Sequence, residues 1–322
     1  MVKSKFLFSI LHFNHLTGLR IFFLSQTMIA LLFLFAGCES DKIKTNEQQP
    51  IDSTAIKDSL LKLEQEKLKI TYHYFPDSGR VNYTGLKKQF EPEEIEIILS
   101  LNRLDAKNFS RRDSVVVPDS FHSDFLRYSP FPVRLAAADS VRKILLFSHR
   151  IQAFAAYENG KLVRWGPTSL GKKSTPTPNG LYHTNWKAKR TVSTVNEEWI
   201  LPWAFNLDNF AGISLHEFDL PGYPASHACA RLTADDAKWI YYWAEQWILS
   251  PGEKYIIAYG TPVIIYDEYN FGGKPPWHFL PQNPDTTKEK TTKLDSLVHA
   301  NLKLILNRQN QRDSVITARE KP

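Results

Sequence analysis

A tight turn between two apolar runs constrains the first part of the fold. Ile151–Tyr157 and Leu162–Trp165 are short and mostly apolar, and Asn159-Gly160 stands between them. Asn-Gly accepts the positive φ angles that a two-residue hairpin needs. Another buried-looking run, Val141–Phe147, comes just before. Short strands joined by tight turns predict a mostly β domain.

Later segments extend this domain. Gly212–His216 and Gly260–Tyr266 have the composition of strands, and a helix is expected to begin after Thr233. The Thr233 hydroxyl can cap the helix, and acidic residues at 235 and 236 suit the positive end of its dipole. Its expected inner face consists of Ala237, Ile240, Tyr241, Ala244 and Trp247.

The residues most able to take part in a reaction lie in and near the loop before that helix. Ser226–Leu232 holds Cys229, one of two cysteines in the chain, with His227 two residues before it and His216 thirteen residues before it. A free thiol has a pKa of about 8.5, so little of it is thiolate at neutral pH. An imidazole that accepts the proton turns the cysteine into a nucleophile with its own base.

These residues resemble the signature of the L,D-transpeptidases, the YkuD-type family, in which a histidine precedes Ser-His-Gly-Cys. The segment Gly171–Gly180 is similar to a second family hallmark, a Gly-Lys turn followed by Thr-Pro-x-Gly, and Gly260–Val263 is similar to a third. Two positions depart from the family pattern. Ala228 replaces glycine, and the interval between His216 and Ser226 is short, with Glu217 in place of a small residue.

The resemblance implies a fold and a reaction. The expected fold is a mostly β catalytic domain over 139–270, a β-sandwich or mixed sheet with a helix after the catalytic cysteine. It is preceded by a small α/β or helical region and flanked by helical tails. The implied activity is formation of 3→3 crosslinks in peptidoglycan, or attachment of a protein to it, through a thioester with release of D-Ala. No metal or cofactor is implied.

The resemblance also assigns roles to individual residues. Cys229 is the nucleophile and His216 is the base. The backbone N–H groups of Ala228 and Cys229 are the oxyanion donors. Ser226 and His227 support the loop.

Three further residues are candidates for substrate binding. Arg231 holds a substrate carboxylate or pairs with an acid such as Asp235. Tyr182 matches an aromatic position near the family's substrate groove. Trp203 belongs to an aromatic interval, 186–210, that forms a wall or lid in the family.

Two other functions stay open at this point. Ala228 and the short loop before Ser226 would also fit a hydrolase of the same fold, an amidase or carboxypeptidase, in which water replaces the acceptor amine. A degenerate site would leave a lipid-anchored protein that only binds peptidoglycan.

The N-terminal residues resemble a lipoprotein signal. Residues 1–38 have a basic start and a short apolar run, and they end in Phe-Ala-Gly-Cys. Cys38 is therefore the expected lipidation site; an uncleaved anchor is the alternative. Either version exports the rest to the cell envelope, facing the peptidoglycan, as a membrane-anchored protein of the periplasm. Residues 39–73 are expected to form a tether and an amphipathic helix.

The remaining segments have weaker signals. Residues 74–120 resemble the second half of a LysM module, which binds glycan, or form a helical spacer. Residues 121–138 are expected to be a linker, and 271–322 a polar helical tail.

The net charge of +6 comes from scattered basic residues, which argues against nucleic acid as a partner. The two cysteines lie in different kinds of sequence, so separate roles are expected for Cys38 and Cys229.

Overall fold

The computed structural model describes residues 70–76, 82–110, 113–193 and 196–320. They all belong to the larger of two structural units of the chain, 53–322. The expected signal, its Cys38 and the expected helix before residue 70 lie outside the described residues. Among the described helices, none is long and apolar enough to cross a membrane.

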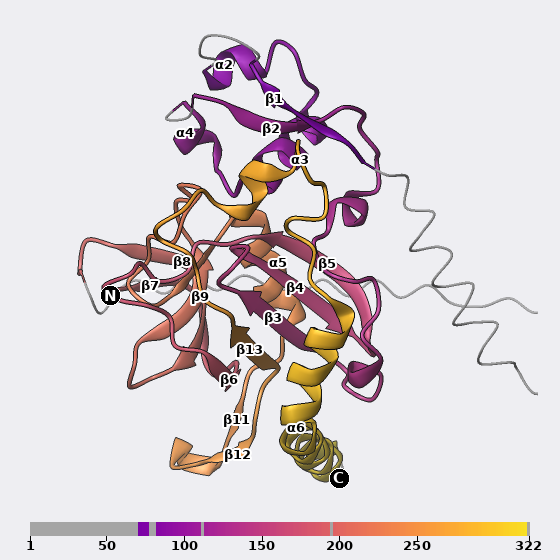
Figure 1. Ribbon diagram of the computed structural model, residues 1–322. Coiled ribbons are helices and arrows are strands. Elements are labelled where there is room, and N and C mark those ends of the chain that lie inside the picture. The colour runs from indigo at the N-terminus through magenta and orange to yellow at the C-terminus, as the bar shows by residue number, and fades with distance from the viewer. Residues whose placement is uncertain (1–69, 77–81, 111–112, 194–195, 321–322) are drawn as a thin grey trace, which may run out of the picture. The chain divides into compact units, whose positions relative to one another are not determined.

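A five-stranded sheet forms the centre of the domain, with the strand order β5-β4-β3-β13-β6 (Figure 1). The strands are β3 (Ile144–Ser148), β4 (Ala153–Glu158), β5 (Lys161–Pro167), β6 (Gly180–His183) and β13 (Pro262–Tyr266). Asn159 and Gly160 have φ angles of 46° and 73°, which confirms the predicted hairpin turn. β13 runs parallel to β3 and antiparallel to β6.

A second sheet has four strands in the order β10-β9-β8-β7. They are β7 (Lys187–Val192), β8 (Ile200–Asp208), β9 (Ile213–Glu217) and β10 (Ala230–Leu232). Leu145 and Phe147 of the first sheet share an apolar core with Phe205 and Leu215 of the second. The two sheets therefore pack as a sandwich, which confirms the expected mostly β fold.

The helix after the cysteine loop is α5 (Ala234–Trp243). Thr233 caps it as predicted, because its hydroxyl accepts a hydrogen bond from the Asp236 N–H at 3.1 Å. Ala237 and Ile240 are buried in the sandwich core. The backbone becomes extended at Ala244, so Trp247, expected on the inner face, lies beyond the helix.

The opposite face of the five-stranded sheet is also covered. Residues 121–138 contribute Phe131, Leu135 and Ala138 to the core beneath Ile144 and Leu146. This segment contains two 3-10 turns, η1 (Phe125–Tyr128) and η2 (Ala136–Ala138). Residues 121–138 therefore form a buried layer across this face of the sheet.

The C-terminal helix completes this layer. α6 (Thr291–Glu320), yellow in Figure 1, buries Leu294, Val298 and Ile305 in the same core. The preceding chain includes β11 (Ile248–Leu249), η3 (Pro251–Glu253), β12 (Ile256–Ala258) and η4 (Pro276–Phe279). The tail is thus helical, as expected, and packed on the domain.

An N-terminal module lies between residues 72 and 118. Two antiparallel strands, β1 (Tyr72–Phe75) and β2 (Val115–Pro118), enclose α2 (Tyr83–Leu86), α3 (Pro92–Asn102) and α4 (Ala106–Phe109). α2 begins at Tyr83 because Asn82 caps it: the Asn82 side chain accepts from the Gly85 N–H at 2.8 Å.

Candidate active site

Two parallel strands bring the cysteine loop to the first histidine. Arg231 of β10 pairs with His216 of β9. Ser214 and His216 are two residues apart on β9, so their side chains point to the same face. Cys229 directly precedes β10, and its sulfur lies 3.5 Å from the Ser214 oxygen. The thiol therefore lies on the face of β9 that carries His216.

Cys229 and His216 line one pocket, with an empty volume of about 310 Å³. Both sequence-predicted catalytic residues are brought together there. The other lining residues are Ser193, Trp199, Leu201, Phe218, Ser226, His227 and Arg231.

His216 has the tautomer and the charge state of a base. Its Nδ1–H donates to the Glu217 carbonyl at 2.9 Å, which leaves Nε2 as the unprotonated nitrogen. Burial lowers the pKa of His216 to about 4; the Glu217 carbonyl opposes this and Arg231 adds to it. The ring is therefore neutral at pH 7.

The thiol is not hydrogen-bonded to this base. Among the described residues, no hydrogen bond joins Cys229 to His216; the sulfur donates instead to the Gly212 carbonyl at 3.4 Å. Catalytic hydrogen bonds often tighten only when substrate is bound. Rotation about the Cα–Cβ bond of Cys229 is the motion that would redirect the thiol. Ser214, which contacts the sulfur, is a site residue that the sequence reasoning missed, although its i−2 spacing from His216 was visible.

The cysteine loop is closed by its own residues and by the Gly-Lys turn. The Ser226 hydroxyl donates to the Cys229 carbonyl at 2.5 Å. The Ser226 carbonyl accepts from the Lys172 N–H at 3.0 Å and the Thr175 hydroxyl at 3.1 Å. Lys172 Nζ also lies 2.9 Å from His227 Nε2. These contacts fit a supporting role for Ser226 and His227, and they add Lys172 to the site.

Ala228 has a backbone conformation that ordinarily favours glycine. Its φ angle is 75°, in the left-handed region. Among the described residues, no hydrogen bond uses the N–H of Ala228 or Cys229. Both expected oxyanion donors are therefore available to a ligand.

Replacing Ala228 by glycine is expected to stabilise the protein. The left-handed conformation costs an L-residue about 1–2 kcal/mol, whereas glycine loses roughly 0.5–1 kcal/mol through its greater freedom in the unfolded chain. The relief of strain outweighs that loss over most of these two ranges, so the free energy of unfolding should rise by up to about 1.5 kcal/mol. Ala225→Gly, in the same loop but without a positive φ, should lower it. Urea unfolding measures both, and equal destabilisation of the two variants would contradict the expectation.

Arg231 lines the pocket, and weak contacts hold its side chain. Its guanidinium lies 4.5 Å from the centre of the Phe218 ring, and Nη1 donates to the Asp219 carbonyl at 3.4 Å. In the described part of the chain, no ion pair joins it to Asp235. The guanidinium thus retains donors for a substrate carboxylate.

The two aromatic candidates lie elsewhere. Trp203 packs against Tyr241 and Tyr242 of α5, with ring centres 5.5 and 5.9 Å away. The Tyr182 hydroxyl donates to the Pro178 carbonyl at 2.9 Å. Neither lines the pocket at Cys229. The aromatic residue of the interval that does so is Trp199, whose ring centre lies 5.4 Å from that of His227.

Comparison with known proteins assigns this domain. Residues 143–265 match the family model described as the L,D-transpeptidase catalytic domain, YkuD. The chain contains an L,D-transpeptidase-type domain. L,D-transpeptidase 2 of Mycobacterium tuberculosis (strain CDC 1551 / Oshkosh) is 27% identical over 123 residues, which span 33% of this chain and 28% of that protein. The chain thus covers under a third of this curated relative.

Solved structures of L,D-transpeptidases are also similar to part of this chain. An L,D-transpeptidase from Mycobacterium tuberculosis H37Rv is 20% identical, covering 48% of this chain and 72% of that one, with a TM-score of 0.32. An L,D-transpeptidase from Mycobacterium smegmatis is 20% identical, covering 39% and 59%, with a TM-score of 0.32.

The N-terminal module holds the loop between His216 and Ser226. The Asp105 carboxylate accepts from the Leu220 N–H at 2.7 Å, and the Asp105 N–H donates to the Leu220 carbonyl at 3.1 Å. Lys107 and Asp219 form an exposed ion pair at 2.8 Å. The shortened loop is therefore anchored from outside the matched domain.

Proposed function

We propose that the protein is a cysteine-dependent peptidoglycan L,D-transpeptidase that forms 3→3 crosslinks through a thioester. The observation that carries the proposal is the pocket shared by Cys229 and His216, in which the His216 ring is neutral and its Nδ1–H is fixed on the Glu217 carbonyl. The family match at residues 143–265 supports the same chemistry.

In the acylation step, the Cys229 sulfur attacks the carbonyl between the third residue of a stem peptide and its terminal D-Ala. His216 Nε2 accepts the thiol proton as the S–C bond forms. The C–N bond then breaks, and the same proton passes to the departing amine of D-Ala. The oxyanion is stabilised by the N–H groups of Ala228 and Cys229, which are free of other hydrogen bonds among the described residues.

In the transfer step, the side-chain amine of a neighbouring stem attacks the thioester. Its nitrogen loses a proton to His216, the C–S bond breaks, and the thiol recovers that proton. Arg231, which lines the pocket, is the candidate to hold a carboxylate of one of the two stems. The products are a crosslinked dimer and free enzyme.

The decisive experiment is intact mass spectrometry after incubation with a tetrapeptide stem. We expect a mass increase that equals the stem without its D-Ala, located on Cys229 by peptide mapping. An unmodified protein, or an adduct at another residue, would reject the mechanism. Analysis of the released muropeptides then separates two outcomes: dimers indicate transfer to an amine, and shortened monomers indicate hydrolysis.

Hydrolysis is the second candidate because of Ala228. Its methyl group occupies a position beside the oxyanion donors where the family has glycine, and it can crowd an incoming acceptor. Under this alternative, Ala228→Gly should raise the ratio of dimers to monomers. An unchanged ratio would remove the argument for hydrolysis.

The rate of acylation is expected to stay high in mildly acidic solution. A base with a lowered pKa remains unprotonated down to that pKa, and the pKa of His216 is lowered to about 4. The acid limb of the rate profile should therefore fall near pH 4 and not near about 6.5, the ordinary value for histidine. Adduct formation measured from pH 3.5 to 8 tests this. A midpoint near about 6.5 would contradict the prediction and exclude a base with a lowered pKa.

The location and the glycan contact belong to the same proposal. We propose that Cys38, outside the described residues, carries a lipid that holds the protein in the cell envelope; a Cys38→Ala variant should be lost from membranes. We also propose that the module at 72–118 binds glycan, on the basis of its strand–helices–strand order. Equal retention on insoluble peptidoglycan of proteins with and without the module would reject this.

A further inference from the structure

The loop between β9 and β10 is held at two places. Its second half is bonded to the matched domain, since the Ala225 N–H donates to the Leu170 carbonyl at 3.0 Å. Its first half is bonded to the N-terminal module at Leu220. The position of this first half therefore depends on a part of the chain that lies outside residues 143–265.

Asp105 makes two hydrogen bonds to Leu220. Its carboxylate accepts from the Leu220 N–H at 2.7 Å, and its own N–H donates to the Leu220 carbonyl at 3.1 Å. The other carboxylate oxygen caps α4 by accepting from the Asn108 N–H at 2.7 Å. Leu104 extends the contact by pairing with Pro221. Since the cap fixes the Asp105 side chain, the two bonds give Leu220 a defined place.

The two residues before Leu220 hold the side chain of Arg231. The Asp219 carbonyl accepts from Arg231 Nη1 at 3.4 Å, and the centre of the Phe218 ring lies 4.5 Å from the guanidinium. The same ring lies edge-on to the His216 ring, with the centres 5.9 Å apart. Among the described residues, these are the only hydrogen bond and ring contact of the guanidinium. A displacement of the loop would therefore displace the charge of Arg231.

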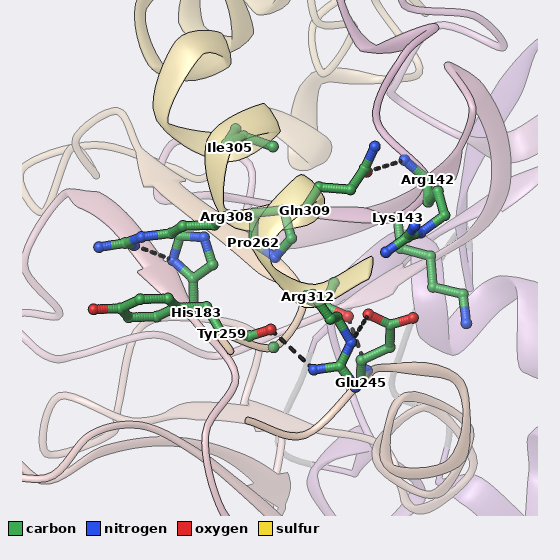
Figure 2. Close-up of a pocket in the computed structure, with 12 residues that line it drawn as sticks. Arg142, Lys143, His183, Glu245, Tyr259, Pro262, Ile305, Arg308, Gln309 and Arg312 are labelled. Atoms are coloured by element: carbon green, nitrogen blue, oxygen red, sulfur yellow. Dashed lines mark hydrogen bonds and ion pairs between the residues drawn. The ribbon is translucent and has the colours of Figure 1, made fainter. Parts of the chain in front are cut away.

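Arg231 differs in this respect from Arg312 of α6. Arg312 forms an ion pair with Glu245 at 2.8 Å and donates to the carbonyls of Gln246 and Tyr259 at 2.8 and 3.0 Å (Figure 2). Its guanidinium is thus fixed by several partners of its own. Within the described ranges, Arg231 has no ion pair with an acid, so its position is set by the loop alone.

We propose that Asp105 is a positioning residue for the proposed reaction: it holds the loop in the place where the Arg231 guanidinium stands beside Cys229. The guanidinium then meets the carboxylate of a stem peptide, and this identity of the ligand is the one step that rests on the proposed function. Asp105 does not line the pocket, so it acts through the loop and not on the substrate. A short loop has little slack, which is why an anchor at one residue fixes its neighbours.

The test is alkylation of Cys229 in the full chain by iodoacetate, an anion, and by iodoacetamide, its neutral analogue, with peptide mapping to follow this cysteine. A positive charge beside the sulfur speeds only the reaction with the anion. The ratio of the two rates therefore reports the place of the Arg231 charge without any stem peptide. Arg231→Met should lower this ratio by about fivefold, since opposite unit charges about 4 Å apart attract even in water.

Asp105→Ser keeps a cap for α4 but is too short to reach Leu220. We expect the ratio to fall by at least about twofold, toward that of Arg231→Met, with an unchanged iodoacetamide rate. Loss of a negative charge alone would raise the ratio, so a fall identifies displacement of the guanidinium. Asp124→Ser, the same change at the cap of η1, should leave the ratio as it is. Asp105→Asn, of nearly the same shape, replaces Asp105→Ser if the latter does not fold.

A double variant shows whether Asp105 acts through Arg231. Asp105→Ser combined with Arg231→Met should have the ratio of Arg231→Met alone, because the two changes act on one contact. With a tetrapeptide stem, Asp105→Ser should raise KM and leave kcat nearly unchanged. Absence of D-Ala release from the unmodified protein would reject the proposed function, and the alkylation ratios would still decide the role of Asp105.

Four results would overturn the proposal. They are an unchanged ratio in Arg231→Met or in the folded Asp105 variants, an equal fall in both alkylation rates, a further fall in the double variant, and an unchanged KM in a protein that releases D-Ala.

Discussion

Replacing Cys229 by alanine is expected to abolish release of D-Ala from a tetrapeptide stem. The sulfur is the nucleophile of the proposed reaction, and loss of a nucleophile from a catalytic unit reduces kcat by at least about a thousandfold. Cys229→Ser should be almost as inactive, because a hydroxyl is far less acidic than a thiol and the neutral His216 is a weak base. Chromatographic measurement of free D-Ala gives the rates.

The matched control for this loss is Ser214→Ala. Ser214 touches the sulfur at 3.5 Å from the same strand as His216, but it has no assigned proton transfer. We expect its rate to fall by far less than that of the Cys229 variants. Thermal unfolding checks that all three proteins fold. Release of D-Ala by folded Cys229→Ala at more than a tenth of the normal rate would exclude this residue as the nucleophile.

Features that depend on a few neighbouring residues could be predicted from the sequence. The turn at Asn159-Gly160 needs positive φ angles that these residues tolerate, and the helix after Thr233 needs a hydroxyl at its cap. The pairing of His216 with the cysteine loop was available from the family motif. Its physical basis, two adjacent parallel strands, required the structure.

Features that depend on local irregularity were not predicted. In a regular strand, residues two apart share a face, so Leu201 and Trp203 should point the same way. The φ angle of Trp203 is 52°, which breaks that alternation. Leu201 therefore lines the pocket while Trp203 packs on α5. Pro202 directly precedes Trp203, and a proline inside a strand is a signal of irregularity that the sequence analysis did not use.

The sequence analysis also missed the burial of segments whose apolar residues follow neither a helical nor a strand period. Residues 121–138 bury Phe131 and Leu135 in extended chain and short 3-10 turns, which leave neither a helical nor a strand period in the sequence. Arg103 illustrates the same difficulty for polar residues. It is 2% exposed, although arginine is almost never fully buried without a partner.

Replacing Arg103 by alanine is expected to destabilise the protein severely. Its guanidinium donates to the carbonyls of Ile151 at 2.8 Å, Ser100 at 2.6 Å and Leu101 at 3.0 Å. It also lies 5.7 Å from the Trp165 ring centre and 5.2 Å from that of Trp277. These contacts tie α3 of the N-terminal module to the sandwich domain and to η4.

Two opposing effects decide how far the free energy of unfolding falls in Arg103→Ala. Removing a buried cation eliminates its desolvation penalty, and burial does lower the pKa of Arg103, to about 9. Alanine, however, leaves the carbonyls of Ile151 and Leu101 without donors, at about 1–3 kcal/mol each, and it leaves a cavity between two indole rings. We therefore expect the free energy of unfolding to fall by at least about 4 kcal/mol.

Three variants separate the causes, by urea unfolding where the protein folds and by limited proteolysis where it does not. Arg103→Lys keeps the charge with fewer donors and should be intermediate. Arg103→Met fills much of the cavity but cannot donate; if it is as stable as the unmodified protein, the three hydrogen bonds contribute nothing beyond the cost of burying the charge, and the expectation is wrong. Arg190→Ala, exposed on β7, should change stability by less than about 0.5 kcal/mol. Arg103 belongs to the module that also holds the loop at Leu220. The module should therefore loosen in Arg103→Lys, and acylation of Cys229 should slow even where the Tm of the sandwich is unchanged.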